Sequence, residues 1–164
     1  MSLTFLLGGA RSGKSRLAVE LAKQWDGPVA VVATAEAGDQ EMAERIRQHR
    51  DERPAAWETL EEPRELASAI ARAPTDAAVV VDCLSLWVAN VLHDDVAGLS
   101  AHALAAAQQR PRTIVVSNEV GLGIVPASPL GRRYRDVLGR VNAEWAAAAD
   151  EAALVVAGKM LRLQ

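Results

Sequence analysis

The chain has 164 residues and a mass of 17.5 kDa, which fits one domain, because domains usually contain about 100 to 200 residues. Half of the residues are hydrophobic and 24% are charged, a balance that is typical of globular proteins and excludes disorder over most of the chain. The net charge of −3 excludes a broad basic surface for nucleic acid or anionic membrane. The single cysteine, Cys83, cannot form an internal disulfide, so we expect a reducing compartment.

The first seven residues are apolar, but they lack the basic region of a signal peptide and are read as a first strand. No uncharged apolar stretch reaches the ~18 residues of a membrane-spanning helix. The alanine-rich stretch 145–156 is interrupted by Asp150 and Glu151. We therefore expect a cytoplasmic protein without a membrane span.

Short apolar runs typical of buried parallel strands alternate with helical patterns along the chain. Strands are expected at residues 4–7, 29–33, 77–81, 113–116 and 154–156. Helices are expected at residues 14–25, 40–53, 62–71, 84–92 and 130–149, and an alanine-rich surface helix at 97–109. This alternation predicts a single α/β domain over residues 1–164, with a mainly parallel sheet flanked by helices.

The most specific motif lies between the first strand and the first helix. Residues 8–15 read Gly-Gly-Ala-Arg-Ser-Gly-Lys-Ser, a complete G-x-x-x-x-G-K-[ST] phosphate-binding loop, or P-loop. Backbone N–H groups of such a loop face the phosphates of a nucleotide, and the helix N-terminus adds partial positive charge. Lys14 would neutralise the β and γ phosphates, and Ser15 would bind Mg²⁺. The alternative is a tight glycine turn with an incidental lysine.

Asp82 follows the apolar run 77–81 and fits a carboxylate that holds Mg²⁺ opposite the P-loop. An aspartate at this position can also cap the helix that follows, so both interpretations stay open. Ligands of open α/β sheets bind beyond the carboxyl ends of the strands. This rule also draws Thr34, Asn118 and Glu119 towards the same crevice.

His49 stands among arginines, whereas His93 and His102 lie in weakly patterned segments and are expected on the surface. Arg45, His49 and Arg53 are spaced four residues apart and would share one face of a helix. Neighbouring cations disfavour the imidazolium, so His49 is expected to stay neutral and nucleophilic. The spacing alone favours the alternative, an exposed histidine on a basic helix.

Together these residues resemble the adenosylcobinamide kinase/adenosylcobinamide-phosphate guanylyltransferase family of cobalamin biosynthesis. The resemblance covers nearly the whole chain. It is carried by the P-loop, by Val32-Ala-Thr34, by the segment from Met42-Ala-Glu-Arg-Ile46 through His49-Arg-Asp51 and Arg53-Pro54 to Trp57, by residues 117–126, Ser-Asn-Glu-Val-Gly-Leu-Gly-Ile-Val-Pro, and by Gly139-Arg-Val-Asn142.

The resemblance implies a bifunctional enzyme that phosphorylates the aminopropanol hydroxyl of adenosylcobinamide with ATP or GTP. The implied enzyme then transfers GMP from GTP to that phosphate, which gives adenosylcobinamide-GDP and pyrophosphate. The resemblance makes His49 the residue that carries GMP covalently, and it implies a RecA-related sheet, a homotrimer and a histidine helix that swings relative to the nucleotide. The implied nucleotide-binding residues are Gly8, Gly9, Ala10, Arg11, Ser12, Gly13, Lys14, Ser15, Ala33, Thr34, Ala35, Arg50, Asp51, Glu52, Arg53, Glu61 and Asp82.

In the expected mechanism, Lys14 and a Mg²⁺ on Ser15 and Asp82 neutralise the triphosphate. Glu119 is a candidate to orient or deprotonate the attacking hydroxyl, and His49 attacks the α phosphorus of GTP. Two other functions stay open on the sequence. One is a P-loop small-molecule kinase without the transferase step, which leaves His49 unexplained. The other is a regulatory ATPase or GTPase that is driven by nucleotide hydrolysis.

Overall fold

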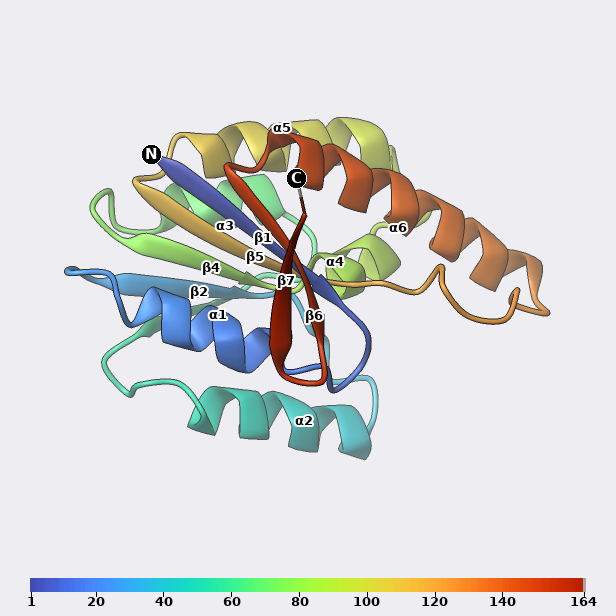
Figure 1. The fold of residues 1–164 in the computed structure, drawn as a ribbon, viewed down its shortest axis with the longest axis horizontal. Helices are drawn as coiled ribbons and strands as arrows, with labels where there is room; N and C mark the ends of the chain where they lie inside the picture. The colour runs from blue at the N-terminus through green and yellow to red at the C-terminus, as the bar shows by residue number, and fades with distance from the viewer. Residues whose placement is uncertain (164) are drawn as a thin grey trace.

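The computed structural model describes residues 1–163, except for the side chain of Arg45, so the last residue of the predicted domain lies outside the described part. These residues form one α/β domain built on a seven-stranded sheet with the strand order β3-β2-β4-β5-β1-β6-β7 (Figure 1). The strands are β1 (Ser2–Gly8), β2 (Val29–Ala33), β3 (Glu58–Glu61), β4 (Ala78–Asp82), β5 (Arg112–Asn118), β6 (Glu151–Val156) and β7 (Lys159–Leu163). The helices are α1 (Lys14–Ala22), α2 (Gln40–Asp51), α3 (Leu66–Arg72), α4 (Leu84–Asn90), α5 (Val96–Gln108) and α6 (Pro129–Ala148).

Strands β1 to β6 are parallel, and only β7 pairs antiparallel, with β6. Strand β1 lies between β5 and β6, and its last residue, Gly8, is opposite Asn118 on one side and Val155 on the other. The carboxyl ends of the parallel strands therefore meet at one edge of the sheet. The P-loop leaves the sheet at this edge, as the predicted fold requires.

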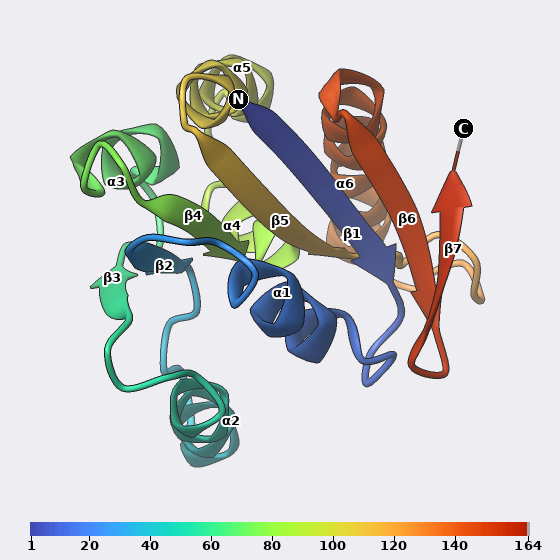
Figure 2. The same ribbon diagram turned by 60° about the vertical axis from the view of Figure 1, so that its left-hand side comes forward.

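Two layers of helices cover the sheet (Figure 2). Helices α3, α5 and α6 lie over one face, where Phe5 and Trp145 belong to the larger apolar core. Helix α1 lies against the opposite face, where Ala18 and Ala22 pack with Leu6 and Ile114. Helix α2 lies on the α1 side and stands apart from the sheet (Figure 2).

The predicted parallel sheet and the predicted helices are confirmed, with shifts at their ends. Helix α6 buries Leu138, Val141 and Trp145, as its apolar spacing predicts. Helix α3 begins at Leu66 and not at residue 62, because the Glu62 carboxylate accepts the backbone N–H groups of Arg64 and Glu65 before the helix starts. Helix α2 ends at Asp51, so Arg53 lies just beyond the helix.

Two strands are absent from the sequence prediction. Strand β3 has the sequence Glu-Thr-Leu-Glu and lies at one edge of the sheet, where only one apolar residue is needed. Strand β7 follows a two-residue turn in which Ala157 and Gly158 both have positive φ, 51° and 73°, and it forms the other edge. Positive φ at both central residues is the geometry of a tight hairpin turn. Within residues 1–163, no helix combines the length and the apolar character needed to cross a membrane.

Candidate functional site

The P-loop connects β1 to α1 through a glycine-rich turn. Gly13 is the N-cap of α1 with a φ of 97°, a left-handed conformation that favours glycine. A Cβ atom at Gly13 would also meet the backbone of Gly158 at 3.2 Å. The hairpin turn supports the loop directly, because the Gly158 N–H donates to the Ser12 carbonyl over 2.8 Å.

Lys14 folds back over this loop and is buried. Its Nζ donates to the Gly9 carbonyl oxygen over 2.9 Å. Burial lowers the pKa of Lys14, and the charges of Cys83 and Asp82 oppose that shift. The Lys14 ammonium therefore lies inside the loop, and its hydrogen bond to the neutral Gly9 carbonyl could be replaced by one to a phosphate oxygen.

Asp82, at the carboxyl edge of the sheet, contacts His49 of α2 and Arg53 just after this helix. Its Oδ2 accepts from the Arg53 guanidinium over 2.8 Å and lies 3.6 Å from Nδ1 of His49. The Arg53 and Asp82 side chains are only 9% and 15% exposed, whereas the His49 side chain is 44% exposed. The alternative role of Asp82 as a helix cap is not seen, because Cys83 is the N-cap of α4 and makes no side-chain cap within the described residues.

The pKa of His49 shifts in the direction opposite to the prediction. The contact with the Asp82 carboxylate raises the pKa of His49, and neither burial nor the charge of Arg53 reverses that shift. The expectation that surrounding cations lower the pKa of His49 is therefore wrong, because Asp82, an acidic residue from β4 that is 33 positions away in sequence, contacts the imidazole. Burial disfavours the Asp82 carboxylate, but His49 and Arg53 outweigh it and lower the pKa of Asp82. The side chain of Arg45, the first of the predicted row, lies outside the described part.

The predicted segment 33–35 adjoins Asp82, but its threonine is engaged with the protein. Thr34 is buried, its Oγ1 donates to the Cys83 carbonyl over 2.7 Å, and it accepts from the Cys83 N–H over 3.0 Å. Asn90 donates to the Thr34 carbonyl over 2.9 Å. In this structure Thr34 positions the segment that carries Asp82, while Ala33 and Ala35 are partly buried beside it.

Near the end of α2, two of the predicted nucleotide-binding residues contact each other and two others are exposed. Arg50 forms an ion pair with Glu61 of β3 at the surface. Asp51 and Glu52 are exposed. Glu119, at the other side of the P-loop, donates its backbone N–H to the Gly8 carbonyl over 3.1 Å, and its carboxylate accepts the N–H of Gly121. The Glu119 carboxylate therefore caps its own loop in the free protein.

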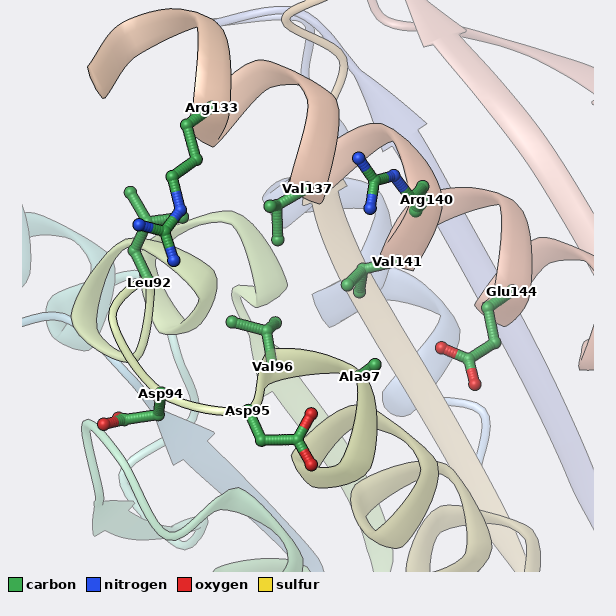
Figure 3. Close-up of a pocket in the computed structure, with 10 residues that line it drawn as sticks. All are labelled: Leu92, Asp94, Asp95, Val96, Ala97, Arg133, Val137, Arg140, Val141 and Glu144. Atoms are coloured by element: carbon green, nitrogen blue, oxygen red, sulfur yellow. The ribbon is translucent and has the colours of Figure 1, made fainter. Parts of the chain in front are cut away.

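The described structure contains two cavities of similar volume, and one of them lies beside the P-loop. A polar cavity of about 460 Å³ lies between the P-loop and α2 and is lined by Arg11 and by four α2 residues that carry no sequence motif: Gln40, Glu41, Glu44 and Gln48. A second cavity, of about 430 Å³, lies between the α4–α5 connection and α6, with Val96, Val137 and Val141 facing one another (Figure 3). None of the predicted site residues lines this second cavity. The first cavity is therefore the one next to the phosphate-binding elements.

The expected Mg²⁺ fits the residues that are present. Among the described residues, no group of three or more acidic, histidine or cysteine side chains forms a cage for a metal. Mg²⁺ does not require such a cage, because it usually binds through one or two protein oxygens, several waters and the substrate phosphates. The Ser15 hydroxyl at the start of α1 and the Asp82 carboxylate are suitable oxygen donors at this edge.

The fold and the loop together define a P-loop NTPase domain. Two solved structures have a similar fold. The flagellar accessory protein FlaH from Methanocaldococcus jannaschii has a TM-score of 0.57 at 18% identity, with 97% of this chain and 74% of that chain covered. An ATPase from the type III secretion system of pathogenic bacteria has a TM-score of 0.54 at 12% identity, with 93% and 50% covered. At these identities the likeness is one of fold alone.

Sequence relatives identify the particular family. The profile of the cobinamide kinase/cobinamide phosphate guanyltransferase family matches residues 4–163. The chain is 45% identical over 165 residues to the bifunctional adenosylcobalamin biosynthesis protein CobP of Pseudomonas aeruginosa, with 97% of this chain and 95% of that protein covered. It is 42% identical to the bifunctional adenosylcobalamin biosynthesis protein CobU of Salmonella typhimurium and 39% identical to CobU of Escherichia coli, with 95% of this chain and 96% of each relative covered. The chain therefore belongs to this family of bifunctional transferases, as the sequence motifs predict.

Proposed function

We propose that this protein phosphorylates adenosylcobinamide with ATP or GTP and then transfers GMP from GTP to the new phosphate through a covalent intermediate on His49. The observation that carries the proposal is the meeting of His49, Arg53 and Asp82 at the edge of the sheet where the P-loop begins. A plain kinase needs the P-loop and the acidic residue, but it has no use for a histidine beside them.

In the kinase step, the P-loop binds the triphosphate through the backbone N–H groups of residues 8–15. Lys14 leaves the Gly9 carbonyl and contacts the β and γ phosphates. When bound to Ser15 and Asp82, Mg²⁺ supplies further neutralisation of the phosphate charge. The aminopropanol hydroxyl attacks the γ phosphorus, the bond to the bridging oxygen of the leaving nucleoside diphosphate breaks, and Glu119 orients or accepts the hydroxyl proton.

In the transferase step, neutral His49 attacks the α phosphorus of GTP and pyrophosphate leaves. Nδ1 of His49 lies 3.6 Å from the Asp82 carboxylate, which raises the pKa of His49, so the imidazole must be in its neutral form and leave Asp82 before it attacks. The phosphate of the substrate then attacks the phosphorus of the histidine adduct and releases His49. Arg11, Arg50 and Arg53 are the proposed cationic partners of the phosphate oxygens, and Ala33, Thr34, Ala35, Asp51, Glu52 and Glu61 complete the proposed nucleotide contacts.

The test is incubation with α-labelled GTP and Mg²⁺, with the wild type compared with His49→Ala. His102→Ala is the matched control, because His102 is an exposed histidine on α5. We expect acid-labile, base-stable label on the wild type and on His102→Ala, and none on His49→Ala. Transfer of γ phosphate to cobinamide without any protein-bound label would reduce the function to that of a kinase.

The proposal also includes a cytoplasmic homotrimer, which rests on the family resemblance. Light scattering coupled to gel filtration measures the mass of the assembly in solution. A mass three times that of the 17.5 kDa chain supports the trimer, and a monomer refutes it.

A further inference from the structure

The connection between β5 and α6 exposes large apolar side chains beside the P-loop. This acceptor loop, as we name residues 119–128, projects from the carboxyl edge of the sheet (Figure 1). Leu122 and Ile124 are 84% and 97% exposed, and Val125 is also exposed. Exposed apolar groups that are clustered in this way mark a binding surface more often than isolated ones do.

Both ends of the acceptor loop are fixed to the protein. At its start, the Glu119 N–H donates to the Gly8 carbonyl, and the Asn142 side chain donates to the Asn118 carbonyl over 3.1 Å. At its end, Arg132 donates to the carbonyls of Pro126 and Ala127 over 2.9 and 2.8 Å. The apolar tip is therefore presented from two anchored ends, one of which is bonded to the first residue of the P-loop.

We propose that Leu122, Ile124 and Val125 form the surface that binds the corrin ring of the acceptor substrate. This inference rests on the proposed function and adds the location of the acceptor. A hydroxyl that attacks the γ phosphorus must lie next to the P-loop, so the macrocycle that carries it must cover the surface around the loop. The corrin ring carries peripheral methyl groups beside its amide side chains, and these methyl groups suit exposed aliphatic side chains.

The length of the acceptor loop agrees with this assignment. Glu119 is the proposed partner of the attacking hydroxyl, and Leu122 and Ile124 follow it by three and five residues. A chain spans at most ~3.3–3.6 Å per residue, so these side chains can lie at most about 10 to 18 Å from Glu119. This upper limit keeps the apolar tip within reach of a substrate whose hydroxyl lies at Glu119 and whose ring is joined to that hydroxyl by the aminopropanol arm.

A second copy of this chain is the competing occupant. A stable interface usually uses about 20 to 30 residues on each partner. The tip offers only a few apolar side chains, which is little for subunit association and enough to contact one face of a macrocycle. We therefore assign the tip to the substrate and treat association as an outcome of the test.

The experiment measures the binding of cobinamide by equilibrium dialysis, with the corrinoid detected by its visible absorbance. The variant is Leu122→Asn/Ile124→Asn, which changes exposed side chains and leaves the core intact. The matched control is Leu163→Asn on β7, an exposed leucine that pairs with Ala152, away from the turn that touches the P-loop. Labelling of His49 by α-labelled GTP, which needs no corrinoid, is measured on every variant.

We expect the double variant to bind cobinamide at least about tenfold more weakly, or about 1.4 kcal/mol, with GTP labelling and the control unchanged. Equal affinity in the double variant and the wild type, with GTP labelling intact, would overturn the acceptor-loop assignment and leave the proposed function standing. A changed oligomeric state with unchanged affinity would overturn it in favour of a second copy. A wild type that binds no cobinamide would overturn both.

Discussion

Replacing Gly8 with alanine is expected to destabilise the protein, although Gly8 has no left-handed φ. A Cβ atom at this position would lie 2.5 Å from the carbonyl oxygen of Val155 and 2.7 Å from Oγ of Ser12. The Val155 oxygen belongs to β6, which is paired with β1, so relief requires the strands or the P-loop to move. Overpacking of this kind costs about 1–3 kcal/mol.

A smaller opposing effect comes from the unfolded chain. Alanine lowers the conformational entropy of the unfolded chain, which stabilises the folded protein by about 0.4–1 kcal/mol. The midpoints of the two effects, about 2 and about 0.7 kcal/mol, leave a net loss of about 1.3 kcal/mol in the free energy of unfolding, or a fall in Tm of roughly 3–5 °C for a domain of this size. Gly9→Ala is the matched control, since a Cβ there meets nothing within 4 Å in the described structure. Urea unfolding and calorimetry measure both variants, and equal stabilities would refute the packing at the start of the P-loop.

Three further predictions concern the charged and polar groups of the site. In the metal-free protein, NMR titration should place the pKa of His49 above 6.5 and show a lower value in Asp82→Asn. Because the folded pKa is raised, the contact between His49 and Asp82 contributes its full stability below pH 6.5, and this stability is lost as the pH rises through the folded pKa. A His49 titration curve that is the same in Asp82→Asn and in the wild type would contradict this prediction. Lys14→Met should lower kcat/KM of the kinase step by about 100-fold or more while unfolding in urea stays similar, and near-normal kinetics would exclude Lys14 from phosphate binding. Ser12→Ala should leave stability unchanged or raise it, since the Ser12 hydroxyl is buried without a hydrogen-bond partner in the described structure; a loss above about 1 kcal/mol would show that it is bonded.

The sequence predicted the sheet and its covering helices because short apolar runs alternate with helical patterns and the P-loop has a fixed spacing. The two edge strands were missed for different reasons. Strand β3 carries charged residues at both ends, so it lacks the apolar pattern of a buried strand. Strand β7 had a usable signal, because Ala157 and Gly158 separate two apolar segments at the length of a hairpin turn.

The P-loop could be located from the sequence because its residues are contiguous. The pairing of His49 with Asp82 could not, since the two residues come from α2 and β4 and nothing in either segment specifies their distance. Spacing along the helix pointed to arginines as the neighbours of His49 and gave the wrong direction for its pKa. A tertiary contact with a carboxylate can raise the pKa of a histidine even when its neighbours along the chain are cations.

The central claim is that His49 carries GMP. Tandem mass spectrometry of the peptide that contains residue 49, after incubation with GTP and Mg²⁺ and digestion at alkaline pH, tests it directly, with a parallel incubation in GDP as the control. The account predicts a guanylyl group on His49 with GTP and none with GDP. An unmodified His49 in an enzyme that still forms cobinamide-GDP would contradict it.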